Sequence, residues 1–251
     1  MLRQLDRKVI LVTGAFGQAG QSAVGMFLEK GAFVLATDYL DMNQSPKMME
    51  LQEQYGGERL QYIKADIFEE NQVQAVMAEV ERHFGRLDGT YHTVYGCVEK
   101  SALELSIEEW ESTLKGTLTS TFLVCKYALP IMIRSGGGSL VNMSSVLAFH
   151  PNPTSLAYGT AKAGINQFTR ILAATYAKQG IRANVIVPGD FKTEENWDIM
   201  SEKTKEIIRS ITLLGRSGKP SEINEMAAFL LSDAASYVTG ALFTIDGGYK
   251  I

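Results

Sequence analysis

Cysteine and histidine are both scarce in this sequence of 251 residues. Cys97 and Cys125 lie far apart and form no C-x-x-C pair, and His83, His92 and His150 are scattered along the chain. Because a zinc site needs about four such ligands at close spacing, we expect no metal site. Two isolated cysteines are typical of reduced thiols that contribute only to packing, which favours a cytoplasmic protein.

An excess of one charge is also lacking. The chain has 24 Lys and Arg residues against 28 Asp and Glu residues, so its net charge is only −4. No basic stripe is present to neutralise phosphates, so we expect no nucleic acid and no membrane among its partners. The first residues lead straight into a short strand-like run and not into a secretory segment. No apolar run looks long enough to span a bilayer.

Linkers and low-complexity segments are missing as well. The glycine-rich stretch 135–139 is short and directly precedes a strand-like run, which indicates a turn and not a domain boundary. Hydrophobic residues make up 45% of the chain and charged residues 21%, which is the usual balance of a globular protein. We therefore expect residues 1–251 to form a single domain.

What the sequence does contain is an alternation of short apolar runs and longer amphipathic segments. Buried strands are expected at 9–12, 33–36, 60–63, 89–94, 140–143, 183–187 and 242–245. Helices are expected at 18–30, 71–84, 106–134, 155–178 and 220–231. This alternation predicts an α/β protein with a doubly wound parallel sheet, a three-layer α/β/α Rossmann fold whose ligands bind beyond the carboxyl ends of the strands.

A glycine-rich turn joins the first strand to the first helix. It reads Thr13-Gly14-Ala15-Phe16-Gly17-Gln18-Ala19-Gly20. Glycines there let the backbone approach a pyrophosphate at the positive end of the helix, so Gly14, Phe16, Gly17, Gln18 and Gly20 are candidate cofactor-binding residues. A tight turn without a ligand is the alternative.

Two acidic residues follow later strands at the same predicted edge. Asp38 ends the second strand, where a carboxylate can accept hydrogen bonds from the ribose hydroxyls of a dinucleotide. A 2′-phosphate at roughly 4 Å from it would cost on the order of 4 kcal/mol per charge pair at an effective dielectric of about 20, so the sequence predicts NAD as the cofactor. Asp66, after the third strand, is placed either at the adenine edge or at a helix N-cap.

Tyr158 and Lys162 stand four residues apart on a predicted helix, which puts their side chains on one face. A phenol has an ordinary pKa near 10, and a neighbouring ammonium would lower it towards the range of a working acid or base. Ser145 follows the strand at 140–143, and its hydroxyl can bond a substrate oxygen as charge develops there. A solvated helix face and a turn serine are the alternatives.

These residues give the chain a resemblance to classical short-chain dehydrogenases/reductases over nearly its full length. The matching pieces are Thr13-Gly14 with Gly20, Asn142-Met143-Ser144-Ser145, Tyr158-Gly159-Thr160-Ala161-Lys162, Pro188-Gly189 with Thr193, and Thr239-Gly240 through Asp246-Gly247-Gly248. The resemblance implies that Tyr158 is the general acid and base. It also implies that Lys162 lowers the pKa of Tyr158 and holds the nicotinamide ribose, and that Ser145 orients the substrate.

By the same resemblance, Pro188, Gly189 and Thr193 lie along the nicotinamide. The resemblance further implies a metal-free hydride transfer between NAD and a small alcohol or carbonyl substrate, and a homo-oligomer, either a tetramer or a dimer. A lid over the cleft is expected at about 190–215.

Three departures from the family pattern stand out. Gln18 takes the place of a glycine, and the Gly14-x-x-Gly17-x-x-Gly20 spacing resembles the extended branch of the superfamily. The family's Asn-Asn-Ala-Gly segment is replaced by residues 93–96, among which Tyr95 is placed to intrude on the cleft. Thr117 stands where a catalytic asparagine is expected. Because a threonine can bond helical backbone and still leave room for a water, we predict a modified proton relay.

The function expected from these observations is an NAD-dependent oxidoreductase that interconverts a secondary alcohol and a ketone. The departures leave a non-catalytic NAD-binding sensor or scaffold as the main alternative. An epimerase with tightly held NAD is a weaker one, because the chain lacks the additional C-terminal length that epimerases use to enclose a nucleotide-sugar.

Overall fold

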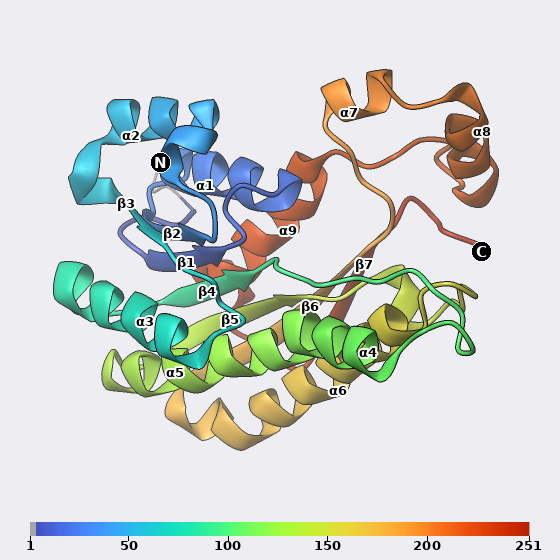
Figure 1. Ribbon diagram of the computed structural model, residues 1–251. Helices are drawn as coiled ribbons and strands as arrows, with labels where there is room; N and C mark the ends of the chain where they lie inside the picture. The colour runs from blue at the N-terminus through green and yellow to red at the C-terminus, as the bar shows by residue number, and fades with distance from the viewer. Residues whose placement is uncertain (1–3, 251) are drawn as a thin grey trace.

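A seven-stranded parallel sheet forms the middle layer of the structure, a computed structural model that describes residues 4–250 (Figure 1). Its strand order is β3-β2-β1-β4-β5-β6-β7, and every neighbouring pair is parallel. The chain runs outward from β1 to β3 and then crosses back to β4. The order therefore reverses between β1 and β4, which is where an open α/β sheet binds ligands. The predicted doubly wound fold is confirmed.

All seven predicted strands are present, most of them extended by one or two residues. They are β1 (Val9–Thr13), β2 (Phe33–Asp38), β3 (Leu60–Lys64), β4 (Gly89–His92), β5 (Gly138–Met143), β6 (Ile181–Pro188) and β7 (Leu242–Ile245). Strand β4 is shorter than predicted and ends at His92 instead of residue 94. The hydroxyl of the next residue, Thr93, donates a hydrogen bond to the Thr13 carbonyl at 2.8 Å, and the chain leaves the sheet at this point.

Helices cover both faces of the sheet. They are α1 (Gln18–Glu29), α2 (Pro46–Arg59), α3 (Glu70–Phe84), α4 (Ile107–Leu114), α5 (Ser120–Arg134), α6 (Leu156–Tyr176), α7 (Glu194–Asp198), α8 (Glu202–Ile211) and α9 (Pro220–Leu231). Buried residues of α1, α2 and α9 pack on one face, and those of α3, α5 and α6 pack on the other. The three-layer prediction is confirmed.

Two helical predictions need correction. Helices α2, α7 and α8 were not expected, and the single helix predicted at 106–134 consists of α4, a π-helical turn at Lys115–Thr119 and α5. The expectation that no segment could span a bilayer also needs correction, because Ile107–Arg134 is long and apolar enough by composition. This stretch is 61% buried inside the fold over its most apolar window, as a core helix of the sheet would be.

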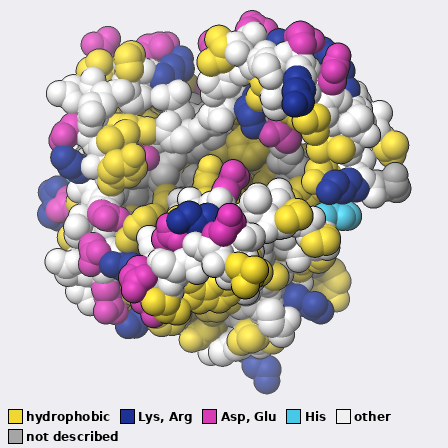
Figure 2. Space-filling model, turned by 45° about the vertical axis from the view of Figure 1, so that its right-hand side comes forward, with side chains coloured by type: hydrophobic (Ala, Val, Ile, Leu, Met, Phe, Trp, Pro, Cys, Tyr) yellow, Lys and Arg dark blue, Asp and Glu magenta, His cyan; other side chains and the backbone are white. Residues whose placement is uncertain are grey.

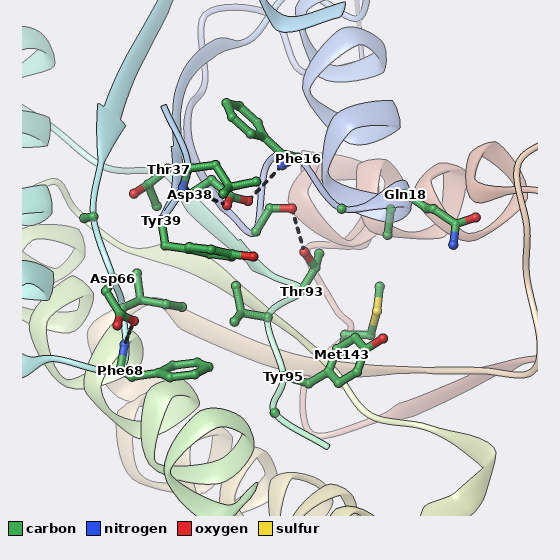
Figure 3. A pocket seen from close by; sticks show the side chains of 18 of the residues that line it. Phe16, Gln18, Thr37, Asp38, Tyr39, Asp66, Phe68, Thr93, Tyr95 and Met143 are labelled. Atoms are coloured by element: carbon green, nitrogen blue, oxygen red, sulfur yellow. Dashed lines mark hydrogen bonds between the residues drawn. The ribbon is translucent and has the colours of Figure 1, made fainter. Parts of the chain in front are cut away.

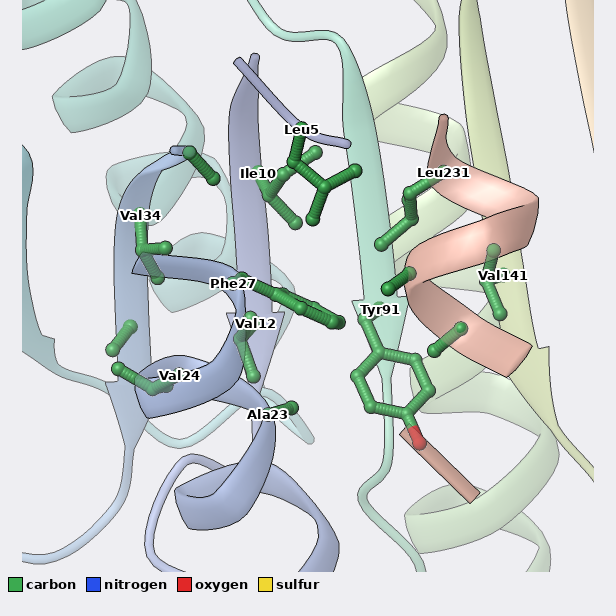
Figure 4. Packing of buried hydrophobic residues seen from close by; sticks show 14 of the residues in the cluster. Leu5, Ile10, Val12, Ala23, Val24, Phe27, Val34, Tyr91, Val141 and Leu231 are labelled. Carbon is green, nitrogen blue, oxygen red and sulfur yellow. The ribbon is translucent and has the colours of Figure 1, made fainter. Parts of the chain in front are cut away.

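A buried polar link ties α1 and α9 to the sheet beside the cofactor turn. Tyr91 of β4 packs against Phe27 of α1 with ring centroids 5.8 Å apart, in the core shown in Figure 4. Its hydroxyl donates to the Asn224 side-chain oxygen at 2.9 Å, and the Asn224 amide donates to the Ala19 carbonyl at 2.9 Å. Since all of these groups are buried and paired, the link fixes the first turn of α1 against the sheet.

Candidate active site

The carboxyl ends of β1, β2, β3 and β4 open onto a cavity of about 730 Å³ (Figure 3). Figure 2 shows one face of the molecule hollowed, with hydrophobic side chains inside the hollow. Six of the predicted cofactor residues line this cavity, namely Gly14, Phe16, Gly17, Gln18, Asp38 and Asp66. Gly20, Pro188, Gly189 and Thr193 are not among its lining residues, and neither are Ser145, Tyr158, Lys162 and Thr117.

The glycine turn has the geometry that a dinucleotide pyrophosphate requires. Gly14 has a φ of +71°, a conformation that disfavours any side chain. A Cβ added to Gly20 would lie 2.0 Å from the Gly14 carbonyl oxygen, so α1 packs against the turn at a distance that only glycine permits. Gly17 is the N-cap of α1, no side chain caps this end, and no acidic residue occupies its first turn. The positive end of α1 therefore faces the cavity with free N–H groups, which fits a phosphate group.

Asp38 lies in the same cavity, at the end predicted for the adenosine, and is almost fully buried. One carboxylate oxygen accepts from the Phe16 N–H at 3.0 Å, and the other accepts from the Leu40 N–H at 3.4 Å. The Phe16 ring turns aside and stacks on Tyr62 with centroids 5.1 Å apart. A carboxylate has about four lone-pair sites, so Asp38 still has capacity for ribose hydroxyls.

Of the two roles that the sequence left open for Asp66, the helix N-cap belongs to Glu69 instead, and the adenine contact stays a prediction. The Asp66 carboxylate accepts from the Phe68 N–H at 2.9 Å, which is a local capping bond, and the residue also lines the cavity (Figure 3). The helix that follows begins four residues later, at Glu70, with Glu69 as its N-cap. Asp66 therefore shapes the turn before α3 while it faces the cavity.

The predicted proton-transfer residues lie beyond Tyr95 and Met143, which line the cavity. Ser145 follows β5 and caps a short 3₁₀ turn by accepting from the Leu147 N–H at 3.1 Å. The Lys162 Nζ donates to the Met143 carbonyl at 2.8 Å and lies 5.4 Å from the centre of the Tyr158 ring. The structure thus brings Ser145, Tyr158 and Lys162 together, as predicted from their spacing.

Burial dominates the acid–base chemistry of this group. It lowers the pKa of Lys162 to about 7 and raises the pKa of Tyr158 well above its usual value, while a hydrogen bond with Ser145 acts in the opposite direction on Tyr158. Burial is the largest influence on the pKa of Tyr158 in this structure, and the lowering of that pKa by Lys162 stays a prediction. The buried amine is itself easily deprotonated, and its Nζ is bonded to the Met143 carbonyl.

Thr117 lies in the π-helical turn and is fully buried. A threonine hydroxyl can bond the backbone of its own helix, but the Thr117 hydroxyl does not, and the modified proton relay stays a prediction. The hydroxyl instead donates to the Gly96 carbonyl at 2.7 Å and accepts from the Gly96 N–H at 3.1 Å. Within the helix, the Thr117 carbonyl accepts from the Thr121 hydroxyl at 2.7 Å. Thr117 therefore secures the loop that carries Tyr95, next to the catalytic group.

Tyr95 enters the site more directly than its sequence position indicated. Its ring packs edge-on against Tyr158 with centroids 5.6 Å apart, and the Lys162 Nζ lies 5.6 Å from the centre of its ring. The side chain is 57% exposed and lines the cavity (Figure 3). Tyr95 thus forms a wall between the cavity and the proton-transfer residues.

His92 is a site residue that the sequence argument missed. Its Nδ1 lies 2.8 Å from the Thr13 hydroxyl and its Nε2 lies 3.4 Å from the Ser120 hydroxyl, so it connects the glycine turn to α5. Burial, followed by the charge of Lys162, lowers its pKa to about 3, and it is therefore neutral. The available signal was a histidine at the end of a buried strand, next to the strand that ends in Thr13.

The segment expected to act as a lid begins after β6. Pro188 ends that strand, and the Gly189 N–H donates to the Ile245 carbonyl at 3.0 Å. Thr193 is the N-cap of α7, and Phe191 lines the cavity. The lid segment is therefore largely helical, made of α7 and α8. Residues 4–250 contain no group of three or more His, Cys, Asp or Glu side chains placed to hold a metal ion.

Comparison with known proteins gives consistent matches along the whole chain. Residues 17–250 match the sequence model of a family described as enoyl-(acyl carrier protein) reductase. Glucose 1-dehydrogenase 2 of Bacillus subtilis (strain 168) is 34% identical, with 100% of this chain and 98% of that protein aligned. The NAD-dependent glycerol dehydrogenase of Listeria innocua serovar 6a is 32% identical over 97% of this chain and 94% of that protein.

Among solved structures, a 7α-hydroxysteroid dehydrogenase complexed with NADH and 7-oxo glycochenodeoxycholic acid superposes with a TM-score of 0.91. It is 25% identical and aligns over 99% of this chain and 96% of that chain. The similarity therefore extends from the glycine turn to β7 in both sequence and structure.

Proposed function

Since the chain belongs to the short-chain dehydrogenase/reductase family and is an oxidoreductase, we propose that it uses NAD to interconvert a secondary alcohol and a ketone, with Tyr158 as the general acid and base. The observation that carries this proposal is the arrangement around one cavity. The open N-terminus of α1 and Asp38 face this cavity, and Ser145, Tyr158 and Lys162 lie together just beyond its wall of Tyr95 and Met143.

Each residue has a defined task in this proposal. The Ser145 hydroxyl orients the substrate oxygen, and the Tyr158 hydroxyl takes a proton from an alcohol or gives one to a ketone. The Lys162 ammonium stabilises the phenolate that Tyr158 becomes during alcohol oxidation. Bound NAD supplies the centre that exchanges a hydride with the carbinol carbon. Pro188, Gly189 and Thr193 would hold the nicotinamide end, and Gly14 with the N-terminus of α1 would hold the pyrophosphate.

The preference for NAD over NADP rests on Asp38. This buried carboxylate would face a 2′-phosphate, and the residues that follow it, Tyr39 and Leu40, provide no cation to offset the repulsion. The names of the glycerol dehydrogenase relative and of the hydroxysteroid dehydrogenase complex mention NAD and NADH, in agreement with this choice. Dissociation constants for the two cofactors test it, and equal binding of NADP would contradict it.

The first experiment is to follow NADH formation with a panel of polyols, sugars, cyclic secondary alcohols and hydroxysteroids. The native protein is compared with Tyr158→Phe. We expect turnover to fall by about 10²–10⁴-fold in the variant while NAD still binds, because only the acid–base step is removed. A variant that retained native turnover would show that Tyr158 is not the acid and base.

The two alternatives are less well supported. A sensor or scaffold has no need for Ser145, Tyr158 and Lys162 to converge, and the relatives described above are named as dehydrogenases and not as epimerases. Cofactor retained throughout purification would favour the epimerase.

We also propose a homo-oligomer in the cytoplasm. Helices α5 and α6 carry an exposed apolar groove, lined by Phe122, Lys126, Leu129, Pro130, Ile133, Phe168, Leu172 and Tyr176. Phe122 and Ile133 are 43% and 38% exposed, which is costly for such side chains unless another copy covers them. Cys97 and Cys125 are both free thiols, in agreement with a reducing compartment.

A further inference from the structure

Gln18 connects two parts of the molecule that are 175 residues apart in sequence. It is the first residue of α1, in the glycine turn, and its side chain is half-buried at the edge of the cavity (Figure 3). Its Oε1 accepts from the backbone N–H of Thr193 at 2.9 Å. Thr193 begins the first helix of the lid, since its own hydroxyl caps α7 by accepting from the Asn196 N–H at 3.3 Å. One side chain therefore spans from the phosphate-binding turn to the lid.

The bond to Thr193 fixes the orientation of the Gln18 amide. A backbone N–H can only donate, so Oε1 must face Thr193 and the Nε2 donors must face the other way. Nε2 has no hydrogen-bond partner among residues 4–250, and it belongs to a residue that lines the cavity beside the open N-terminus of α1. These donors are placed to bind an anion at the same point as the helix N-terminus.

Other bonds join the lid to the residues that directly follow it and to the C-terminal segment. The Lys192 N–H donates to the Gly218 carbonyl at 2.9 Å, and Glu194 pairs with Lys219 at 2.6 Å. At the far end, the Leu214 N–H donates to the Gly247 carbonyl at 3.0 Å. Within the described residues, the Gln18–Thr193 bond is the only hydrogen bond between the lid segment 190–215 and the glycine turn or α1.

We propose that Gln18 is a positioning residue that makes the order of the lid depend on the pyrophosphate of the dinucleotide. Its Nε2 donates to a pyrophosphate oxygen, while its Oε1 holds the first turn of α7 over the cleft. The pyrophosphate fixes the amide, and the amide fixes the lid. This inference rests on the proposed cofactor site, and it predicts that the nicotinamide itself is not needed to order the lid.

Limited trypsin digestion measures lid order directly, because Lys203, Lys205 and Arg209 lie in α8. Cleavage rates are recorded without ligand and at saturating NAD, ADP-ribose or AMP, and nucleotide binding is measured separately by calorimetry. In the native protein, NAD and ADP-ribose should both slow lid cleavage about tenfold. AMP, which lacks the pyrophosphate, should slow it less than twofold.

Two variants of Gln18 test its acceptor and its donor separately, and a third variant is the control. Gln18→Met has a similar shape and neither polar group, so NAD should bind about tenfold more weakly and saturating NAD should no longer protect the lid. Gln18→Glu keeps the acceptor for Thr193 but loses the donor, so its cleavage without ligand should match that of the native protein while NAD protection is lost. Gln21→Met is the matched control, because the Gln21 amide lies on the same helix and bonds Ser45 at 2.8 Å instead of the lid. It should behave as the native protein does.

A failure of the Gln18 inference can be distinguished from a failure of the proposed cofactor site. Gln18→Met that binds NAD and is protected as strongly as the native protein would overturn the inference and leave the cofactor proposal intact. Protection by NAD but not by ADP-ribose would also overturn it, because the nicotinamide would then order the lid. Native protein that binds neither nucleotide would overturn the proposed cofactor and this inference together.

Discussion

Lys162 is the residue whose burial has the most direct chemical consequence. An amine that is fully enclosed and bonded only to the Met143 carbonyl gives up its proton far more readily than one in water, and its pKa falls to about 7. The group that should stabilise the Tyr158 phenolate is thus only partly charged at neutral pH. Activity in the oxidative direction therefore depends on how the bound reactants change the surroundings of this one amine.

The lowered pKa of Lys162 should also make the stability of the protein depend on pH. Between about pH 7 and pH 10.5 the unfolded chain keeps a proton on Lys162 that the folded protein has lost, so the free energy of unfolding rises with pH. Lys162→Met removes this contribution. Relative to the variant, the native protein should gain on the order of a few kcal/mol as the pH rises from 7 to 10, measured by urea unfolding. Parallel pH profiles for the two proteins would contradict the prediction.

Thr117 provides a second test at the scale of a single hydroxyl. Thr117→Val keeps the shape but leaves the N–H and the carbonyl of Gly96 without their partner, which should cost about 1–3 kcal/mol in the free energy of unfolding. Turnover should also fall, because Gly96 follows Tyr95 in the wall of the site. Thr117→Ser keeps the hydroxyl and should lose less than half as much stability. A valine variant as stable as the native protein would show that the bridge contributes nothing.

At the scale of elements, the position of α1 depends on its close packing against the glycine turn that precedes it. Gly20→Ala would place a Cβ 2.0 Å from the Gly14 carbonyl oxygen, so the helix must shift. We expect a loss of at least about 2 kcal/mol in the free energy of unfolding and at least tenfold weaker NAD binding. Gly25→Ala is the matched control on the same helix, since its Cβ would meet Leu51 at an ordinary 3.7 Å. It should be neutral or stabilising by up to about 1 kcal/mol. Similar behaviour of the two variants would contradict this account.

Elements whose apolar residues form a run or repeat at a regular spacing were predictable from the sequence, and elements without such a pattern were not. The strands and α9 follow from runs such as Leu242–Ile245 and Pro220–Leu231, which match the structure residue for residue. Helix α2 was missed because only Met48 and Leu51 are buried and Gly56 breaks it with a φ of 66°. Its start was nevertheless readable, since Ser45 caps the helix just before Pro46.

The π-helical turn had no sequence signal of its own. It adds one residue to a turn inside a segment that already has helical periodicity, and its local effect is to place Thr117 opposite Gly96. The Ser145, Tyr158 and Lys162 group was predictable because the three residues lie on adjacent elements of one crossover. The Gln18–Thr193 contact was not, since it joins segments 175 residues apart through side-chain geometry alone.

At the scale of the whole molecule, the active site and the proposed oligomer share α5 and α6. Helix α5 begins where the π-helical turn ends, and α6 carries Tyr158 and Lys162 on one side and Phe168 and Tyr176 in the apolar groove. A second copy packed on the groove would hold both helices against the sheet. Association would therefore support the geometry of the site without providing any residue to it.

Charge placed in the groove should separate the copies. Ile133→Glu puts a carboxylate among apolar side chains, and a buried unpaired charge of this kind is strongly unfavourable at an interface. We expect a lower molar mass by size-exclusion chromatography with light scattering, together with a lower melting temperature. Ile207→Glu is the control, because Ile207 is a similarly exposed isoleucine on α8, outside the groove. If the groove is the interface, only the Ile133 variant changes mass, and an unchanged mass in both would place the interface elsewhere.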